Sequence, residues 1–299
     1  MSESSAFDSE RPLPDEALSR REPTLLGFDD RYSRVRSQLR LLLEADKLPA
    51  WNKKHHGGKL ALTALVSDQY PLIIFHGDVG TGKTVTAECI ANRLVAESGT
   101  EDSILFKLSN RVRGSGLVGE MGSQLSDAFA RIAKSIGKTR RAILIIDEGD
   151  SLGASRSQAH SHHEDKVAVN TLIQGIDNLR HHGGRIVVFL CTNRLSALDP
   201  ALRRRAAVTD KFCRPTAEER RRLLEMDLAG LDVTSAQVEK LVAATGGGEG
   251  GPDWTFSDIR TRLYPAALAK AYPDGPLRFE HLIDNAMAMH ASPVLEDHA

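Results

Sequence analysis

The chain has 299 residues, 41% hydrophobic and 26% charged, as is typical of a folded globular protein. Its 39 Lys and Arg nearly balance 40 Asp and Glu, whereas dedicated nucleic-acid binders usually carry excess positive charge. No apolar run approaches the roughly 20 residues of a membrane-spanning helix, and the acidic, polar beginning excludes a secretory signal peptide. Three scattered cysteines exclude a disulfide framework. We expect a soluble, cytoplasmic protein that binds neither membrane nor nucleic acid.

The first part of the chain changes character near residue 25. Residues 1–22 are rich in Ser, Glu, Asp and Pro without apolar periodicity, which predicts a disordered tail. Beyond them, Val35, Leu39 and Leu42 lie at helical spacing and predict an amphipathic helix. Residues 51–59, with two histidines followed by two glycines, are expected to form a loop.

Four short apolar runs then alternate with helical patterns. The runs are continuous, which is typical of strands buried on both faces, and they cover residues 72–75, 104–108, 142–146 and 186–190. Helical patterns between them cover residues 84–95, 123–136 and 166–179. Such alternation predicts an α/β fold, a parallel sheet covered by helices on both sides.

The strand patterns stop after Cys213. Thr216 and Glu219 form a capping box that predicts the start of a helix ending near residue 228. Further helices are predicted at 236–244, at 257–271 with an interruption at Pro265, and at 277–289, with a mobile glycine-rich connection at 246–251. The sequence thus predicts a tail (1–22), an α/β nucleotide-binding domain (23–213) and a small helical domain (214–299).

The strongest motif is a GxxxxGK[ST] run at residues 77–84, which we call the phosphate loop. It follows a predicted strand and opens a predicted helix, a context that argues against a chance glycine-rich turn. Its backbone N–H groups would cradle phosphates, Lys83 would reach the β- and γ-phosphates, and the Thr84 hydroxyl would bind Mg²⁺. The expected nucleotide-binding residues here are Gly77, Asp78, Val79, Gly80, Thr81, Gly82, Lys83, Thr84 and Val85.

Two later strand ends carry polar residues that complement this loop. Asp147 and Glu148 follow four aliphatic residues; Asp147 would bind Mg²⁺, and Glu148 would polarise the attacking water. Asn193 follows the next strand and would hydrogen-bond the γ-phosphate or that water. The alternatives are a solvent-facing acidic strand end for the carboxylates and an ordinary turn residue for Asn193.

Three adjacent arginines, Arg203 to Arg205, follow a predicted helix start. Helical neighbours point about 100° apart, so all three cannot face one phosphate. We expect one or two, Arg205 ahead of Arg204, to enter the ATP site of an adjoining protomer. The alternative is a solvated basic helix end favoured by the helix dipole.

The order of these motifs resembles the AAA+ ATPase module across about residues 23–290. The resemblance implies ATP and Mg²⁺ as cofactors, a P-loop sheet of five parallel strands, a helical lid and a hexameric ring with ATP between subunits. Residues 169–177 and 199–215 are similar to the pachytene-checkpoint type, which remodels HORMA-domain proteins. Bacterial members of that type lie beside HORMA proteins and cyclic-oligonucleotide synthases in antiphage defence operons.

The resemblance also implies further site residues. Leu117 and Val118 occupy the pore-loop position, with Leu117 in place of the family's aromatic residue, which implies a weaker grip on a threaded chain. Either Arg260 or Arg262 would be the lid arginine aimed at ATP, unless both are ordinary exposed helix charges. Asp78 and Val79 replace the usual Pro-Pro of the phosphate loop, a change expected to be silent because backbone groups bind the phosphates.

A metal site at His160, His162 and His163 is not expected, because these residues lie in a polar stretch without regular ligand geometry. The predicted function is an ATP-driven motor that remodels a partner protein. A DNA-associated loader or helicase is the alternative, disfavoured by the net charge of −1, and a zinc protease is excluded because no HExxH sequence is present.

Overall fold

The computed structural model describes residues 6–44, 47–63, 69–99, 103–109, 112, 120–136, 140–149 and 163–295. The chain forms two compact units. The first comprises Met1–Pro23, Gly27–His76 and Thr84–Lys211, and the second comprises Thr24–Leu26, Gly77–Lys83 and Phe212–Ala299. Residues 77–83 of the phosphate loop therefore group with the C-terminal helical residues, whereas Thr84 belongs to the first unit.

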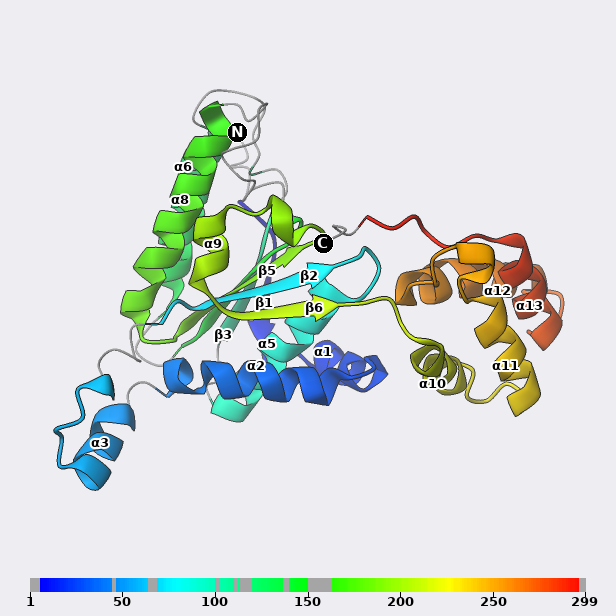
Figure 1. Cartoon of the computed structure of the whole chain (residues 1–299), viewed down its shortest axis with the longest axis horizontal. Helices are drawn as coiled ribbons and strands as arrows, with labels where there is room; N and C mark the ends of the chain where they lie inside the picture. The colour runs from blue at the N-terminus through cyan, green and yellow to red at the C-terminus, as the bar shows by residue number, and fades with distance from the viewer. Residues whose placement is uncertain are drawn as a thin grey trace. The chain divides into compact units, whose positions relative to one another are not determined.

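The first unit is built on a six-stranded, mostly parallel sheet with the order β1-β3-β4-β5-β2-β6 (Figure 1). The neighbours β3, β4, β5 and β2 are parallel, and β1 is antiparallel to β3. The strands are β1 (Phe7–Leu13), β2 (Leu72–Gly77), β3 (Ser103–Leu108), β4 (Ala142–Ile146), β5 (Ile186–Thr192) and β6 (Ala206–Phe212). The predicted α/β class is confirmed, but the predicted five parallel strands are corrected to six strands of mixed direction.

Helices cover both faces of this sheet (Figure 1): α6 (Glu120–Ser135) and α8 (His163–Leu179) on one, α2 (Phe28–Leu43) and α5 (Lys83–Ser98) on the other. Because side chains alternate along a strand, Leu72 and Ile74 pack into the core beneath α6 and α8. These two helices approach closely at Gly175, where a Cβ would lie 2.4 Å from the ring of Phe129. The three helices predicted between the apolar runs are confirmed.

The predicted disordered tail is wrong for residues 7–21. Residues 7–13 form the edge strand β1, and Glu16–Arg21 form helix α1, whose N-cap residue Asp15 is tied to Asn92 by a 2.7 Å hydrogen bond. Only the end residues Phe7 and Leu13 of the strand are buried. An edge strand with charged, exposed middle positions shows no apolar periodicity, which explains why the pattern was missed.

The predicted loop at 51–59 is also largely helical. Helix α3 spans Leu48–His56, with Pro49 in its first turn and Gly57 in a left-handed conformation at its end. Proline at the start and glycine just past the end are ordinary helix signals. The residues between these signals show no apolar periodicity, because Asn52 is the one buried residue of the helix. The sequence pattern therefore does not predict it.

The second unit contains the C-terminal helices α10 (Ala217–Asp227), α11 (Ser235–Ala244), α12 (Tyr264–Ala271) and α13 (Phe279–Ala288). The predicted capping box is present, with Thr216 and Glu219 each bonded to the other's backbone N–H. A π-helical turn, Asp258–Leu263, precedes α12 and leaves Pro265 in the first turn of that helix. Gly248–Gly250 in the glycine-rich connection form a short 3₁₀ turn.

The position of β1 gives a direct test of this corrected architecture. Phe7 is 4% exposed and lies 4.9 Å, centroid to centroid, from the Phe106 ring. Phe7→Ala should lower the free energy of unfolding by about 3 kcal/mol, because it leaves a cavity beside the core. Urea unfolding measures this loss, and the exposed Ser9→Ala is the matched control. Equal stability of Phe7→Ala and the wild type would contradict a packed β1 and support the expected disordered tail at residues 1–22.

Candidate functional site

The phosphate loop connects β2 to α5 and has a backbone that demands glycine. Gly77, Gly80 and Gly82 have φ values of 133°, 76° and 92°, which residues with side chains rarely adopt. A Cβ on Gly77 would lie 2.0 Å from the carbonyl oxygen of Phe212, and one on Gly80 would lie 2.7 Å from the Thr255 hydroxyl. Dihedral angle and close packing therefore both require glycine at these two positions.

Lys83 is directed into the loop and is only 7% exposed. Its Nζ donates hydrogen bonds to the carbonyl oxygens of Gly77 and Asp78, each at 2.9 Å, and the Thr81 hydroxyl donates to the Asp78 carbonyl at 2.7 Å. These bonds hold the ammonium group inside the curl of the loop. A phosphate bound by the loop would therefore meet a fixed positive charge.

The two predicted Mg²⁺ ligands lie together in the first unit. The Thr84 hydroxyl donates a 2.9 Å hydrogen bond to Oδ2 of Asp147, which follows β4. A hydroxyl and a carboxylate are hard oxygen ligands, and Mg²⁺ is usually held by one or two protein groups together with substrate phosphates and water. The residues present therefore fit this ion. Among the described residues there is no cluster of three or more His, Cys, Asp or Glu for a metal held by protein alone.

Glu148 stands out in the backbone. With φ of 51°, it is the one residue other than glycine with positive φ within the described ranges. Its side chain is exposed, while Gly149 after it is buried so closely that a Cβ would lie 2.4 Å from Leu190. A left-handed non-glycine residue is strained, and such residues gather at functional sites. The strained backbone therefore favours the expected functional role of Glu148.

Asn193 lies directly after β5, the neighbour of both β4 and β2 in the sheet. Ile146 pairs in register with Leu190, so Asp147 and Asn193 both lie just beyond the carboxyl ends of adjacent parallel strands. Ligands of open α/β sheets bind at this edge. The structure therefore places Asn193 on the same edge as Asp147 and Glu148.

The arginine cluster is divided by its contacts. Arg205 is bidentate to Asp177 of α8, with distances of 2.6 and 2.9 Å, and its guanidinium lies over the Tyr70 ring. Hydrogen bonding to Asp177, partly opposed by burial, raises the pKa of Arg205. Arg203 and Arg204 are exposed in the last turn of α9 (Pro200–Arg205). Of the two expected arginines, Arg204 projects to the surface, whereas Arg205 is held within its own chain.

Both candidate lid arginines are paired within the second unit. Arg260 is bidentate to Asp227, with both distances 2.7 Å, and Arg262 lies 2.6 Å from Asp258. Contact of either arginine with ATP remains a prediction. The expected pore-loop residues Leu117 and Val118 lie outside the described residues, as do His160 and His162.

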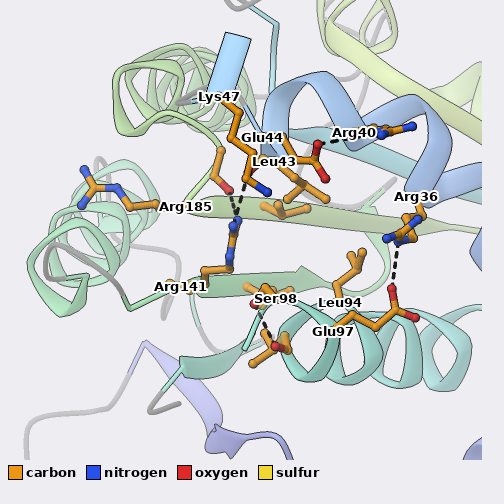
Figure 2. A pocket seen from close by; sticks show the side chains of 15 residues that line it. Arg36, Arg40, Leu43, Glu44, Lys47, Leu94, Glu97, Ser98, Arg141 and Arg185 are labelled. Atoms are coloured by element: carbon orange, nitrogen blue, oxygen red, sulfur yellow. Dashed lines mark hydrogen bonds and ion pairs between the residues drawn. The ribbon is translucent and has the colours of Figure 1, made fainter. Parts of the chain in front are cut away.

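A cavity of about 340 Å³ occupies a different place in the first unit (Figure 2). Residues at the amino ends of β4 and β5 line it, together with the ends of α2 and α5. Arg141 points into it and donates to the carbonyl oxygens of Gly184 (3.0 Å) and Leu43 (3.3 Å), and Arg36 pairs with Glu97 at 2.8 Å. Because the phosphate loop follows a carboxyl strand end, this cavity is not the nucleotide site.

Comparison with known proteins agrees with this geometry. Residues 73–214 match the family model described as "ATPase family associated with various cellular activities (AAA)". CD-NTase-associated protein 6 of Escherichia coli (strain KTE188) is 62% identical over 297 residues, which cover 99% of this chain and 100% of the relative. The chain belongs to the CD-NTase-associated protein 6 family of AAA ATPases. Nucleotide binding and ATPase activity follow from this membership.

Solved structures extend the similarity of this AAA ATPase to its whole length. A chain of the E. coli MS115-1 HORMA:CdnC:Trip13 complex is 37% identical, with a TM-score of 0.87 and 97% of both chains covered. Rhizobiales Trip13 is 34% identical, with a TM-score of 0.69, covering 96% of this chain and 99% of that one. The predicted resemblance to the pachytene-checkpoint type is confirmed. Within the described residues, no helix is long and apolar enough to cross a membrane.

The contact between Thr84 and Asp147 predicts how ATP binding depends on Mg²⁺. Thr84→Val should weaken ATP binding in Mg²⁺ about tenfold, or about 1.4 kcal/mol, because it removes an oxygen ligand while keeping the shape of the side chain. Affinity measured in EDTA should not change. Titration with a fluorescent ATP analogue measures both values, and Thr86→Val, in the same helix, is the control. An equal loss with and without Mg²⁺ would remove Thr84 from the metal site.

Proposed function

We propose that this ATPase couples ATP hydrolysis to the remodelling of a HORMA-domain protein. The observation that carries the proposal is the full-length similarity to a chain of a solved complex that contains HORMA, CdnC and Trip13. The association with a CD-NTase in the relatives' name supports the expected place in an antiphage defence operon. The complete set of hydrolytic residues supports an active motor over an inactive nucleotide-binding protein.

The residues divide the work of hydrolysis among them. Mg²⁺, held by Thr84 and Asp147, would neutralise charge on the β- and γ-phosphates. Lys83 binds the same phosphates from inside the loop. Glu148 orients the attacking water and accepts its proton, and Asn193 hydrogen-bonds the water or the γ-phosphate. Positioning and charge stabilisation of this kind account for most of the catalysis of phosphoryl transfer.

A neighbouring copy would complete the site in a ring, expected to be a hexamer. Arg204 supports this part of the proposal, because its exposed side chain lies in the last turn of the short helix α9, whose N-cap, Asp199, is fixed by a 2.8 Å bond from the Ala201 amide. Arg205 would have to give up two bonds to Asp177 to reach another subunit. Leu117 and Val118 would contact the partner protein in the central pore.

Glu148→Gln tests the coupling of hydrolysis to remodelling. The variant should bind ATP like the wild type and lose at least about 100-fold in turnover, because glutamine cannot accept the proton of the attacking water. Phosphate release and analogue binding measure the two properties. With ATP bound, it should retain a HORMA-domain protein, such as the one in the E. coli MS115-1 complex, in a pull-down.

Three results of this experiment would count against parts of the proposal. Undiminished turnover of Glu148→Gln would remove Glu148 from catalysis. Failure to retain any HORMA protein would refute the partner class. Salt-dependent retention of DNA with stimulated ATPase activity would favour the loader or helicase alternative.

Mixing two inactive variants tests the contribution of a neighbouring copy. Arg204→Ala should bind ATP but lower turnover about 10³-fold, the typical size of an arginine-finger effect. Lys83→Ala should not bind ATP but still offers Arg204 to its neighbour. ATPase activity should therefore reappear when the two are mixed, and Arg203→Ala is the matched control. No recovery on mixing, although both variants assemble, would contradict action between subunits.

A further inference from the structure

Asp78, the second residue of the phosphate loop, has a buried side chain that several hydrogen bonds hold in place. Its side chain is 2% exposed. Oδ1 accepts hydrogen bonds from the amides of Val79 (2.8 Å) and Leu295 (3.0 Å), and Oδ2 accepts one from Nε of Arg214 (2.5 Å). Residues 217 positions apart in the chain therefore meet at one carboxylate in the second unit.

All three nitrogens of the Arg214 guanidinium donate hydrogen bonds within the second unit. Besides Asp78, it donates from Nη1 to the carbonyl oxygen of Asp253 (2.6 Å) and from Nη2 to those of Ser292 (2.9 Å) and Pro293 (3.0 Å). Nε and both Nη atoms thus have acceptors, and the side chain is 11% exposed. An arginine so engaged is a positioning residue rather than a direct ligand of a phosphate. We call Asp78, Arg214 and Ser292–Leu295 the clasp.

The clasp continues into the helical domain. The Ser292 hydroxyl donates to Asp258 at 2.5 Å, and Asp258, the first residue of the π-helical turn, also accepts from the amide and hydroxyl of Thr255. Burial raises the pKa of Asp258, but the bonds from Ser292, Thr255 and Arg262 outweigh it and lower the pKa to about 2. The Ser257 amide donates to the carbonyl oxygen of Gly80 at 3.0 Å. Two points of the phosphate loop are therefore tied to this domain.

Charge explains why the clasp is needed. A carboxylate within a phosphate-binding loop repels the anionic ligand, and a buried carboxylate without a partner is costly. Arg214 removes both costs, because its guanidinium lies at hydrogen-bond distance from the Asp78 carboxylate and neutralises its charge. The carbonyl oxygens of residues 253, 292 and 293 then orient that guanidinium toward Asp78.

We propose that the clasp neutralises the loop's own carboxylate and fixes the loop to the C-terminal segment, and that it thereby sets the affinity of the site for ATP. This inference rests on nucleotide binding by the phosphate loop. According to this proposal, Asp78 in place of the usual proline affects nucleotide binding. The sequence alone predicts no effect of this replacement. It also gives the C-terminal residues 292–295 a role in nucleotide binding.

Removal and rescue of charge test the clasp. Arg214→Ala should raise the dissociation constant of a non-hydrolysable ATP analogue by about 30-fold, because it leaves Asp78 charged and unpaired. Asp78→Asn alone should raise the dissociation constant only about fivefold, because it breaks the ion pair but leaves no uncompensated negative charge in the loop, and combining it with Arg214→Ala should bring the affinity back to about that level. Calorimetry measures the affinities, and the exposed Arg222→Ala is the control. A double variant as weak as Arg214→Ala would overturn the proposal, because Arg214 would then act on the ligand itself.

A second substitution tests the C-terminal segment without creating a cavity in the core. Leu295→Pro removes the amide that donates to Asp78, and the residue is 53% exposed, so the fold should persist. It should weaken analogue binding about threefold, whereas Val294→Pro, which keeps that amide, should not. Equal affinities of the two variants would contradict a role of this segment.

Lys83→Ala separates the clasp from the nucleotide site. If the wild type fails to bind the analogue, or Lys83→Ala binds it equally well, the phosphate loop is not the site and the proposed function fails. The other outcome is that the wild type binds the analogue, Lys83→Ala does not, and Asp78→Asn fails to restore affinity to Arg214→Ala. In that case the proposal about the clasp is refuted, while the phosphate loop remains the nucleotide site. Thermal unfolding of every variant distinguishes loss of affinity from loss of fold.

Discussion

The carboxyl ends of β2, β4 and β5 lie at one edge of a buried sheet, and this constraint gathers the site from distant parts of the chain. Every residue of β4 and β5 is buried, so the polar groups expected to bind a ligand come directly after the strands. Thr84 and Asp147, 63 positions apart, meet at 2.9 Å for this reason. The left-handed backbone of Glu148 lies at the same edge, one residue after Asp147, the expected metal ligand.

The sequence predicted those parts of the fold in which one residue type fills a whole element. β4 is a continuous apolar run, β2, β3 and β5 are mostly apolar, and the phosphate loop requires glycine at defined positions, so these elements follow from local pattern. The local pattern does not predict β1, because only Phe7 and Leu13 of this edge strand are buried. It does not predict α3 either, because that helix buries only Asn52. These elements depend on neighbours that a local pattern does not contain: β1 on β3, and Asn52 on the Leu60 backbone.

The arginines show the same limit at the level of single side chains. Their spacing showed that they could not all serve one phosphate, but it could not show which of them was already occupied. Arg205 is taken by Asp177, 28 positions away, and Arg260 by Asp227, 33 positions away. Both partners come from other helices, so only the tertiary structure separates an arginine that holds its own chain together from one that faces solvent. The expectation that Arg205 rather than Arg204 is the donated arginine stays a prediction, and the pairing of Arg205 with Asp177 now separates the two side chains.

Asp78 shows how one substitution can make a binding loop depend on the rest of the chain. Proline would stiffen the loop through its fixed φ and would bring no charge. Aspartate brings a charge that must be cancelled, and the cancelling arginine is held by residues 253, 292 and 293. The shape of the loop then depends on the C-terminal segment and, through Ser292, on Asp258. Hydrogen bonds between Gly80 and Ser257, and from Asp78 through Arg214 and Ser292 to Asp258, therefore join the phosphate loop to the π-helical turn that precedes α12.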